Sequence, residues 1–392
     1  MKICIISVGV VGLPVPAVRG GAVENLIENY IRFNETEAQD EITVISCDNL
    51  EARVDAKQYQ FSKFIFLDTS SIKYSITKFI RGGINKCSPF YIGNAFLSQL
   101  PDLSGFDTVV VENRPEYGHY IRKKFKGNLI LHLHNDLLAD NPYVADYSVY
   151  DKIISVSDFI AKKSETLQLN VPITTVYNGI DTNRFIHEYS SEELSLLQKD
   201  LSVLPDDFVI SFFGRINKQK GIMELLKAFL ALPDDSNIKL LVVGSSVFGK
   251  TELDEFTREI QTLAAQASER VIFTGYIDYR DIPKYHQISD CIVIPSIWDE
   301  PAGLTVCEAL LSAKNLITTN TGGTPEIVEG SEAVVVASDV NIVENLKSAL
   351  LHVYLKGKCH SIIEANRARG LYFSINRYGK DFRSALVPKR KE

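Results

Sequence analysis

The sequence lacks the features that mark membrane-spanning, secreted or disulfide-stapled proteins. No apolar run approaches the length of a membrane span, and the first residues, MKICIIS, enter a strand pattern directly without a signal-peptide pattern. The 6 cysteines are scattered, and no C-x-x-C pair indicates zinc or redox chemistry. We therefore expect a cytoplasmic protein with reduced cysteines, long enough at 392 residues for two domains.

Acidic residues are in excess, with 49 Asp and Glu against 42 Lys and Arg and a net charge of −7. This excess argues against nucleic acid as a partner. Residues 69–101, by contrast, contain no acid, and their basic residues are interleaved with aromatic ones. The basic residues there are Lys73, Lys78, Arg81 and Lys86, and a second basic run spans 122–126. These segments could rest on an anionic membrane surface, hold a phosphorylated acceptor through Lys78 and Arg81, or be solvated faces.

Strand and helix patterns alternate along the whole chain, which is typical of the α/β class with parallel sheets. The strands predicted in the first half are 2–8, 41–46, 61–67, 108–112, 129–134, 152–155 and 174–177. Those in the second half are 208–213, 239–243, 271–274, 291–294, 316–319 and 333–336. Polar residues 188–207 separate the two series, as expected of a connection between domains. The prediction is two Rossmann-like domains, 1–181 and 182–373, facing each other across a cleft.

Residues 295–326 carry the most informative pattern. A loop with Glu300 follows a predicted strand, a helix begins near Leu304, and a second strand leads to the glycine turn TGGTPE. The unpaired N–H groups at a helix start favour a phosphate. Glu300 is placed to accept hydrogen bonds from sugar hydroxyls, and the Glu308 side chain points back toward the helix start, where a ribose could lie. The two acids could also be a glycosidase pair, and Glu308 could be an ordinary helix residue.

The basic loop GRINKQKG spans residues 214–221 between a predicted strand and a helix. Arg215 and Lys220 can meet the two charges of a diphosphate, whereas Lys218 is expected to face solvent. A solvated basic loop is the alternative. A diphosphate clamp would be of no use to a glycosidase. No Asp-x-Asp motif, a common metal chelator of nucleotide-sugar enzymes, occurs in the chain, so we expect Arg215, Lys220 and a helix dipole to neutralise a diphosphate without a metal.

A glycine-rich loop follows the first predicted strand and precedes a helix over 22–33. Gly20 and Gly21 could bring backbone N–H groups close to a phosphate or sugar, or they could form a plain turn. The loop is not a G-x-G-x-x-G fingerprint, so a dinucleotide cofactor is not expected.

Two histidines end another predicted strand. Because side chains alternate along a strand, His132 and His134 point to the same face. Two histidines without a third ligand nearby make a weak case for a metal. We interpret His134, with Asn135 and Asp136, as a substrate contact, and leave His132 as either a contact or a core residue.

Together these motifs resemble the retaining GT-B glycosyltransferases of family 4 over nearly the whole chain. The motifs that carry the resemblance are Gly20-Gly21, His134, Asn178-Gly179-Ile180-Asp181, Gly214-Arg215 with Lys220-Gly221, and Glu300-x7-Glu308 followed by TGG-x-PE. The last of these is highly specific, whereas a glycine pair alone would be weak. The resemblance implies a GT-B fold, a nucleoside-diphosphate-sugar donor, and transfer with retention and without a metal.

The resemblance also implies a role for each matching residue. Arg215 and Lys220, after Gly214, would hold the diphosphate, and the glycine loop would face the diphosphate and acceptor. Glu300 would contact the sugar, Glu308 the ribose, and His134 would lie by the transferred sugar. The backbone of Gly303, Leu304 and Thr305 would touch sugar or phosphate. The C-terminal helix, about 374–392, would pack back onto the first domain. Ala302 departs from the family pattern, which often has an aromatic residue there.

The activity we expect is transfer of a hexose or N-acetylhexosamine, from a UDP-sugar before other donors, to a glycan or lipid-linked acceptor. Such enzymes build surface polysaccharide or lipopolysaccharide, in the cytoplasm or at the inner face of the cell membrane. A nucleotide-sugar 2-epimerase of the same fold is one alternative. A non-catalytic structural protein is another, but it would be expected to lose Arg215, Lys220 or the glutamates.

Overall fold

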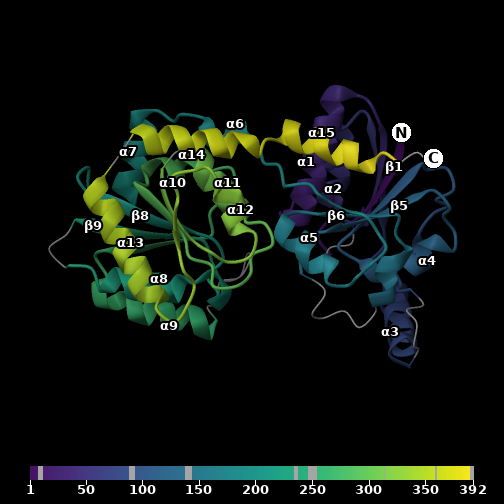
Figure 1. The fold of residues 1–392 in the computed structure, drawn as a ribbon, viewed down its shortest axis with the longest axis horizontal. Helices are drawn as coiled ribbons and strands as arrows, with labels where there is room; N and C mark the ends of the chain where they lie inside the picture. Colours follow the sequence, from purple (N-terminus) through teal and green to yellow (C-terminus); the bar gives the residue numbers. More distant parts are fainter. Residues whose placement is uncertain are drawn as a thin grey trace. The chain divides into compact units, whose positions relative to one another are not determined.

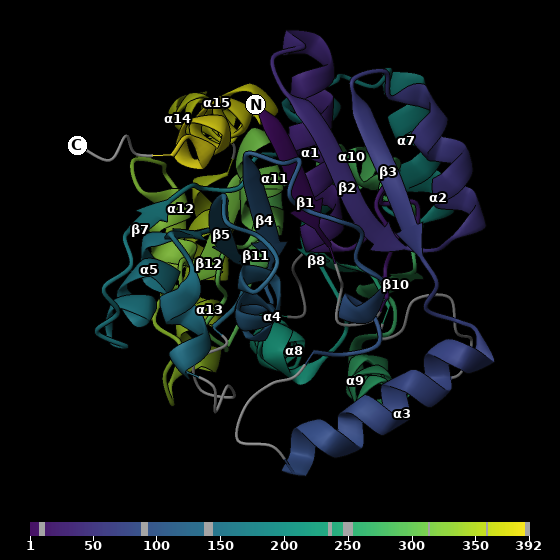
Figure 2. The same cartoon turned by 90° about the vertical axis from the view of Figure 1, so that its right-hand side faces the viewer.

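The computed structural model describes residues 1–7, 12–87, 93–136, 144–233, 237–245, 254–312, 314–357 and 360–388. The chain forms two compact units, each an open sheet with helices around it (Figures 1 and 2). The first comprises Met1–Ile180 with Ile375–Glu392, and the second comprises Asp181–Ser374. Across the described ranges, no helix combines the length and apolar content that a membrane crossing requires.

The first unit is built on a seven-stranded parallel sheet in the order β3-β2-β1-β4-β5-β6-β7. All five residues of the central strand β4 are buried, as expected of a parallel sheet covered on both faces. The strands are β1 (Lys2–Ile6), β2 (Glu41–Cys47), β3 (Ser62–Leu67), β4 (Thr108–Glu112), β5 (Asn128–Leu133), β6 (Lys152–Ser155) and β7 (Ile173–Thr175). The helices are α1 (Ala22–Glu37), α2 (Leu50–Asp55), α3 (Ile72–Cys87), α4 (Gly118–Arg122), α5 (Asp158–Glu165) and α15 (Ile375–Leu386).

The second unit is built on a six-stranded parallel sheet in the order β10-β9-β8-β11-β12-β13. The strands are β8 (Phe208–Phe213), β9 (Ile238–Val243), β10 (Val271–Gly275), β11 (Cys291–Ile294), β12 (Asn315–Thr319) and β13 (Val334–Val336). The helices are α6 (Thr182–Ile186), α7 (Ser191–Asp200), α8 (Ile222–Leu230), α9 (Glu255–Ala264), α10 (Ile282–Ile288), α11 (Leu304–Leu311), α12 (Thr324–Val328), α13 (Ile342–Lys356) and α14 (His360–Tyr372).

The predicted α/β class is confirmed, and every predicted strand overlaps an observed one. The strand order reverses direction at β1 in the first sheet and at β8 in the second. In doubly wound sheets, ligands bind at the carboxyl ends of the strands beside this reversal. The first strand was predicted to reach Val8, but β1 ends at Ile6, and Val8 lies outside the described residues.

The segment 188–207 corrects the prediction, because it is not a bare connection between domains. It lies within the second unit and contains α7. Ser190 and Glu193 form a capping box at the start of this helix, with the Ser190 N–H donating to Glu193 Oε2 at 3.1 Å. No residue of α7 is buried. A helix that lies on the surface needs few apolar residues, and this explains why the segment has the polar composition of a linker.

The last helix, α15, packs against α1 of the first unit. The Phe382 ring meets the Tyr30 ring edge-on, with 4.9 Å between centroids. Arg383 Nε donates to the buried Asp40 carboxylate at 2.7 Å. At Gly379 the two helices approach so closely that a Cβ would lie 2.1 Å from Cγ of Phe33.

We expect Gly379→Ala to lower the free energy of unfolding by about 1–3 kcal/mol, because the added methyl group overpacks the contact with Phe33. Gly83→Ala in α3 is the matched control, since a Cβ there meets nothing within 4 Å. Relief of glycine's helix penalty should make the control neutral or more stable by about 0.5–1 kcal/mol. Denaturant unfolding checks both, and equal midpoints for the two variants would contradict the packing.

Candidate active site

Glu300 is held in place by a glycine turn at the carboxyl end of the second sheet. The Gly323 N–H donates to the Glu300 carbonyl oxygen at 2.8 Å. At Gly322, where φ is 55°, a Cβ would lie only 2.2 Å from the same oxygen. Glycine is therefore required for this approach of the two backbones. The turn TGGTPE, which the sequence suggested as part of an anion site, here positions Glu300.

The basic loop 214–221 packs against the same region through a second glycine. A Cβ at Gly221, where φ is 69°, would lie 1.8 Å from the Pro295 carbonyl oxygen. The Ile297 N–H donates to the Gln219 carbonyl at 2.9 Å. These contacts bring the end of the loop beside the residues that follow β11.

Lys220 and Glu300 consequently form an ion pair, with 2.6 Å between Nζ and Oε2. Both side chains are largely buried, at 16% and 15% exposed. Trp298 Nε1 and Ser296 Oγ also donate to Oε2, at 3.0 Å and 3.4 Å. Within the described part of the chain, the other carboxylate oxygen, Oε1, accepts no hydrogen bond. Arg215 lies exposed on the loop, after the half-buried Gly214.

The start of α11 carries backbone N–H groups that no side chain caps. Gly303 is the N-cap residue, and Leu304 and Thr305, both half-buried, form the first turn. The first N–H groups of a helix have no intrahelical acceptor, and together with the helix dipole they attract anions.

Glu308 is buried on α11. Its Oε1 accepts a hydrogen bond from Tyr279 Oη at 2.8 Å. The Arg184 guanidinium lies over the Tyr279 ring, 4.7 Å from its centroid. Burial raises the pKa of Glu308 to about 7, although the Tyr279 hydrogen bond and the Arg184 charge oppose this rise.

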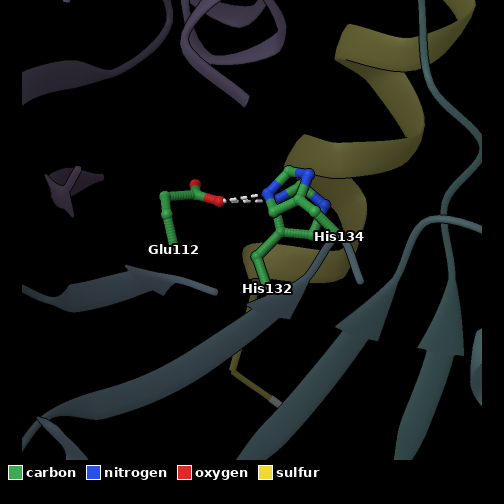
Figure 3. Close-up of side chains that lie close together, drawn as sticks. All are labelled: Glu112, His132 and His134. Atoms are coloured by element: carbon green, nitrogen blue, oxygen red, sulfur yellow. Dashed lines mark hydrogen bonds and ion pairs between the residues drawn. The ribbon is translucent and has the colours of Figure 1, made fainter. Parts of the chain in front are cut away.

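The two predicted histidines of the first unit share a carboxylate that the sequence reasoning missed. Figure 3 shows Glu112 pointing at His132 and His134. Glu112 ends β4 and pairs in register with His132 of β5. Its Oε2 lies 2.6 Å from His134 Nε2 and 2.9 Å from His132 Nδ1. All three residues are buried, and the Phe382 ring of α15 lies 4.9 Å from the His132 ring.

The charge state of this cluster follows from its contacts. Burial disfavours an ionised Glu112, but the attraction and hydrogen bonds of His132 and His134 outweigh it and lower the Glu112 pKa to about 2. Burial also lowers the pKa of His134, with repulsion from His132 adding to it. At neutral pH a neutral His134 thus donates from Nε2–H to an ionised Glu112, which leaves Nδ1 as an acceptor.

Glu112 also corrects the argument that the histidines lack a third ligand. Its carboxylate and the two imidazoles offer ligand atoms that all lie within 4.8 Å of one another. Two histidines and one carboxylate are a ligand set used by zinc and other transition metals. The cluster therefore offers the ligand atoms of a cation site.

The glycine loop of the first unit lies beside an acid. Gly20 and Gly21 have φ angles of 71° and 110°, and Gly21 is the N-cap of α1. A Cβ at Gly21 would lie 2.1 Å from Glu24 Oε2. Glu24 is buried, and burial raises its pKa, whereas His134 is among the groups that lower it. The start of α1, predicted to approach a phosphate or sugar, is thus covered by a carboxylate of the chain.

The predicted acceptor residues lie on separate elements of the first unit. Asp136 pairs with Lys163 of α5 at 2.9 Å, and Asn135 is half-buried beside it. Lys78 is exposed and Arg81 half-buried on α3.

Glu112, Tyr279 and Trp298 are among the side chains of these groups that were not predicted. A signal existed only for Glu112, since it is an acid at the end of an otherwise apolar strand. Tyr279 and Trp298 lie in loops, and nothing in the spacing of the sequence connects them to Glu308 or Glu300.

The raised pKa of Glu308 predicts a pH-dependent stability. Between about pH 4.5 and about pH 7 the folded chain holds this proton while the unfolded chain has lost it, so the Glu308 contribution to the free energy of unfolding falls as pH rises. We expect Glu308→Gln to gain about 1–3 kcal/mol over wild type across this range. Urea unfolding of both proteins at several pH values checks this, and a pH-independent difference would contradict it.

The chain matches known proteins in sequence. The family model "Glycosyl transferases group 1" matches residues 197–369. The chain is 28% identical to spore coat protein SA of Bacillus subtilis over 84% of this chain and 83% of that protein. It is 24% identical to the putative glycosyltransferase YtcC of the same organism, over 97% and 92%. It is 27% identical to the lipopolysaccharide 1,2-N-acetylglucosaminetransferase of Salmonella typhimurium, over 68% of each.

Solved structures share the fold. Anabaena Alr3699/HepE in complex with UDP and glucose superposes with a TM-score of 0.72 at 18% identity, over 98% of this chain and 99% of that one. A glycosyltransferase from Rickettsia africae gives 0.76 at 19% identity, over 98% and 97%. The chain is therefore a glycosyltransferase with the GT-B fold, and its residues 197–369 match the family model of the glycosyl transferases group 1.

Proposed function

We propose that the protein is a retaining, metal-independent transferase that moves a hexose or N-acetylhexosamine from a UDP-sugar to a glycan or lipid-linked acceptor. The observation that carries this proposal is the Lys220–Glu300 pair beside the first turn of α11. A cation, a hydroxyl-binding carboxylate and a helix start suit a sugar diphosphate. The UDP complex of Alr3699/HepE and the lipopolysaccharide enzyme of Salmonella support the donor and the pathway class.

In this proposal the diphosphate lies at the first turn of α11. Lys220, Arg215 and the backbone N–H groups of Leu304 and Thr305 would neutralise its charge. The pair with Glu300 keeps Lys220 in position, because Oε2 already accepts its hydrogen bond. Oε1 of Glu300 would then accept from a sugar hydroxyl, so one carboxylate would connect the sugar to the diphosphate clamp.

The chemical step breaks the bond between the anomeric carbon and the diphosphate oxygen, which keeps the electron pair. The acceptor hydroxyl attacks from the same face, and its proton passes to the leaving diphosphate. Negative charge therefore grows on the diphosphate in the transition state, where Lys220, Arg215 and the α11 dipole would stabilise it. Retention follows because the new bond forms on the face that the diphosphate leaves.

Glu308 and His134 have separate roles in the proposal. Glu308, held by Tyr279, would bind the ribose from its place on α11. His134 would approach the transferred sugar with Nδ1 as an acceptor, because Nε2–H is directed to Glu112. Glu112 is then a positioning residue that fixes which nitrogen of His134 faces the sugar.

A non-catalytic role is the second candidate, because one relative is named a spore coat protein. Arg215, Lys220, Glu300 and Glu308 are all retained here, which favours catalysis. A 2-epimerase would change the donor's sugar without an acceptor. Analysis of products separates the three roles, since only a transferase yields both a nucleoside diphosphate and a glycosylated acceptor.

We expect release of nucleoside diphosphate from at least one member of a panel of UDP-, GDP-, ADP- and dTDP-sugars. Lys220→Ala should lower kcat by roughly 10²–10³ through loss of transition-state stabilisation. Lys218→Ala is the matched control, because Lys218 is exposed on the same loop, and this substitution should leave kcat unchanged. The transferase proposal fails if no donor of the panel is turned over and Glu300→Ala binds the nucleotides as tightly as wild type does.

Chelation tests the absence of a metal requirement. Because Lys220, Arg215 and a helix dipole supply the positive charge, we expect activity to survive dialysis against EDTA. A cation required at Glu112, His132 and His134 would give the opposite result: activity lost with EDTA and restored by Zn²⁺ or Mn²⁺. Metal analysis of Glu112→Gln beside wild type would then locate the ion.

A further inference from the structure

The helix α3 presents its apolar side chains to solvent. Ile72 is 81% exposed and Phe79 is 84% exposed. Ile76, Ile80 and Ile84 are 55%, 55% and 47% exposed. No residue of α3 is buried. A surface helix of a globular protein ordinarily does the reverse and buries its apolar stripe.

These residues lie on one side of the helix. Positions 72, 76, 79, 80 and 84 follow the three- and four-residue spacing that places side chains on a common face. The half-buried residues of α3, which face the rest of the unit, are Tyr74, Thr77, Arg81 and Asn85. Asn85 Nδ2 donates to the Gly93 carbonyl at 3.2 Å. The helix is thus mounted with polar groups inward and apolar groups outward.

The charge of α3 differs from that of the whole chain. The helix contains Lys73, Lys78, Arg81 and Lys86 and no acid, although the chain carries a net charge of −7. Lys73 and Lys86 project near the two edges of the apolar face, where their aliphatic stems can follow that face while the ammonium groups reach outward. Figures 1 and 2 both show α3 projecting from the first unit, away from the strands of its sheet.

We propose that α3 docks the protein on an anionic lipid bilayer, lying in the plane of the interface. Ile72, Ile76, Phe79, Ile80 and Ile84 would enter the boundary between head groups and acyl chains, and Lys73 and Lys86 would meet lipid phosphates. A large apolar face combined with basic flanks is the pattern of helices that lie on membranes. A second copy of the chain fits less well, because symmetric pairing through the apolar face of α3 would bring Lys73 and Lys86 of one copy against those of the other. This inference is independent of the sugar-transfer proposal.

Flotation with lipid vesicles tests the proposal on the full chain without donor or acceptor. We expect binding to phosphatidylcholine vesicles that contain about 30% phosphatidylglycerol, weaker binding to pure phosphatidylcholine, and a loss on raising NaCl from about 0.1 M to about 0.5 M. Phe79→Ser with Ile80→Ser should reduce binding at least roughly tenfold. Lys73→Gln with Lys86→Gln should reduce binding and weaken its salt dependence.

Leu355→Ser is the matched control, because Leu355 is 82% exposed on α13 of the second unit, and it should bind vesicles like wild type. Since the substituted side chains are exposed, all of these variants should have the melting temperature of wild type. In a Cys359→Ser background, an environment-sensitive fluorophore can be attached to Cys87 at the end of α3, because Cys4, Cys47, Cys291 and Cys307 are buried. The emission of this fluorophore should shift to the blue when vesicles are added.

Equal flotation of wild type and Phe79→Ser/Ile80→Ser would overturn the proposal. So would a wild-type dimer in sedimentation that the same substitutions make monomeric, because α3 would then bind a second copy. Donor turnover is measured in the same variants. We expect it to be unchanged in Phe79→Ser/Ile80→Ser, so a loss of membrane docking can be told apart from a loss of sugar transfer.

Discussion

The close approach of two loop backbones at Glu300 organises the candidate donor site. Gly322 allows the turn after β12 to lie against the Glu300 carbonyl, and Gly221 allows the basic loop to lie against Pro295. A side chain at either glycine would push these loops apart. Lys220 reaches Glu300 only because both approaches are made. The glycines thus act on the chemistry indirectly, by fixing where a lysine and a carboxylate meet.

Both units carry their candidate site residues at the carboxyl ends of central parallel strands. In the second unit these are β8 and β11, and in the first they are β4 and β5. Register brings Glu112 beside His132, and side-chain alternation adds His134. The result is a buried carboxylate whose ionised form is stabilised by its neighbours, with the tautomer of His134 set by the contact.

Helices α15 and α3 show two opposite uses of an apolar face. α15 buries Phe382 between Tyr30 and His132, and so covers the histidine cluster from behind. α3 leaves Phe79 and its neighbours in solvent. Hydrophobic periodicity alone gives both helices the same pattern, because the period states which residues share a face and not what covers that face.

The sequence alone determined the α/β class, the positions of the strands and the family motifs, because these depend on local periodicity and on short spacings. It also singled out Lys220, Glu300, Glu308 and His134 as candidate site residues. It did not join Lys220 to Glu300, Tyr279 to Glu308 or Glu112 to His134, and it misread residues 188–207. Those outcomes depend on strand order, register and loop packing, which bring together residues far apart in the chain. Only the tertiary structure decided them.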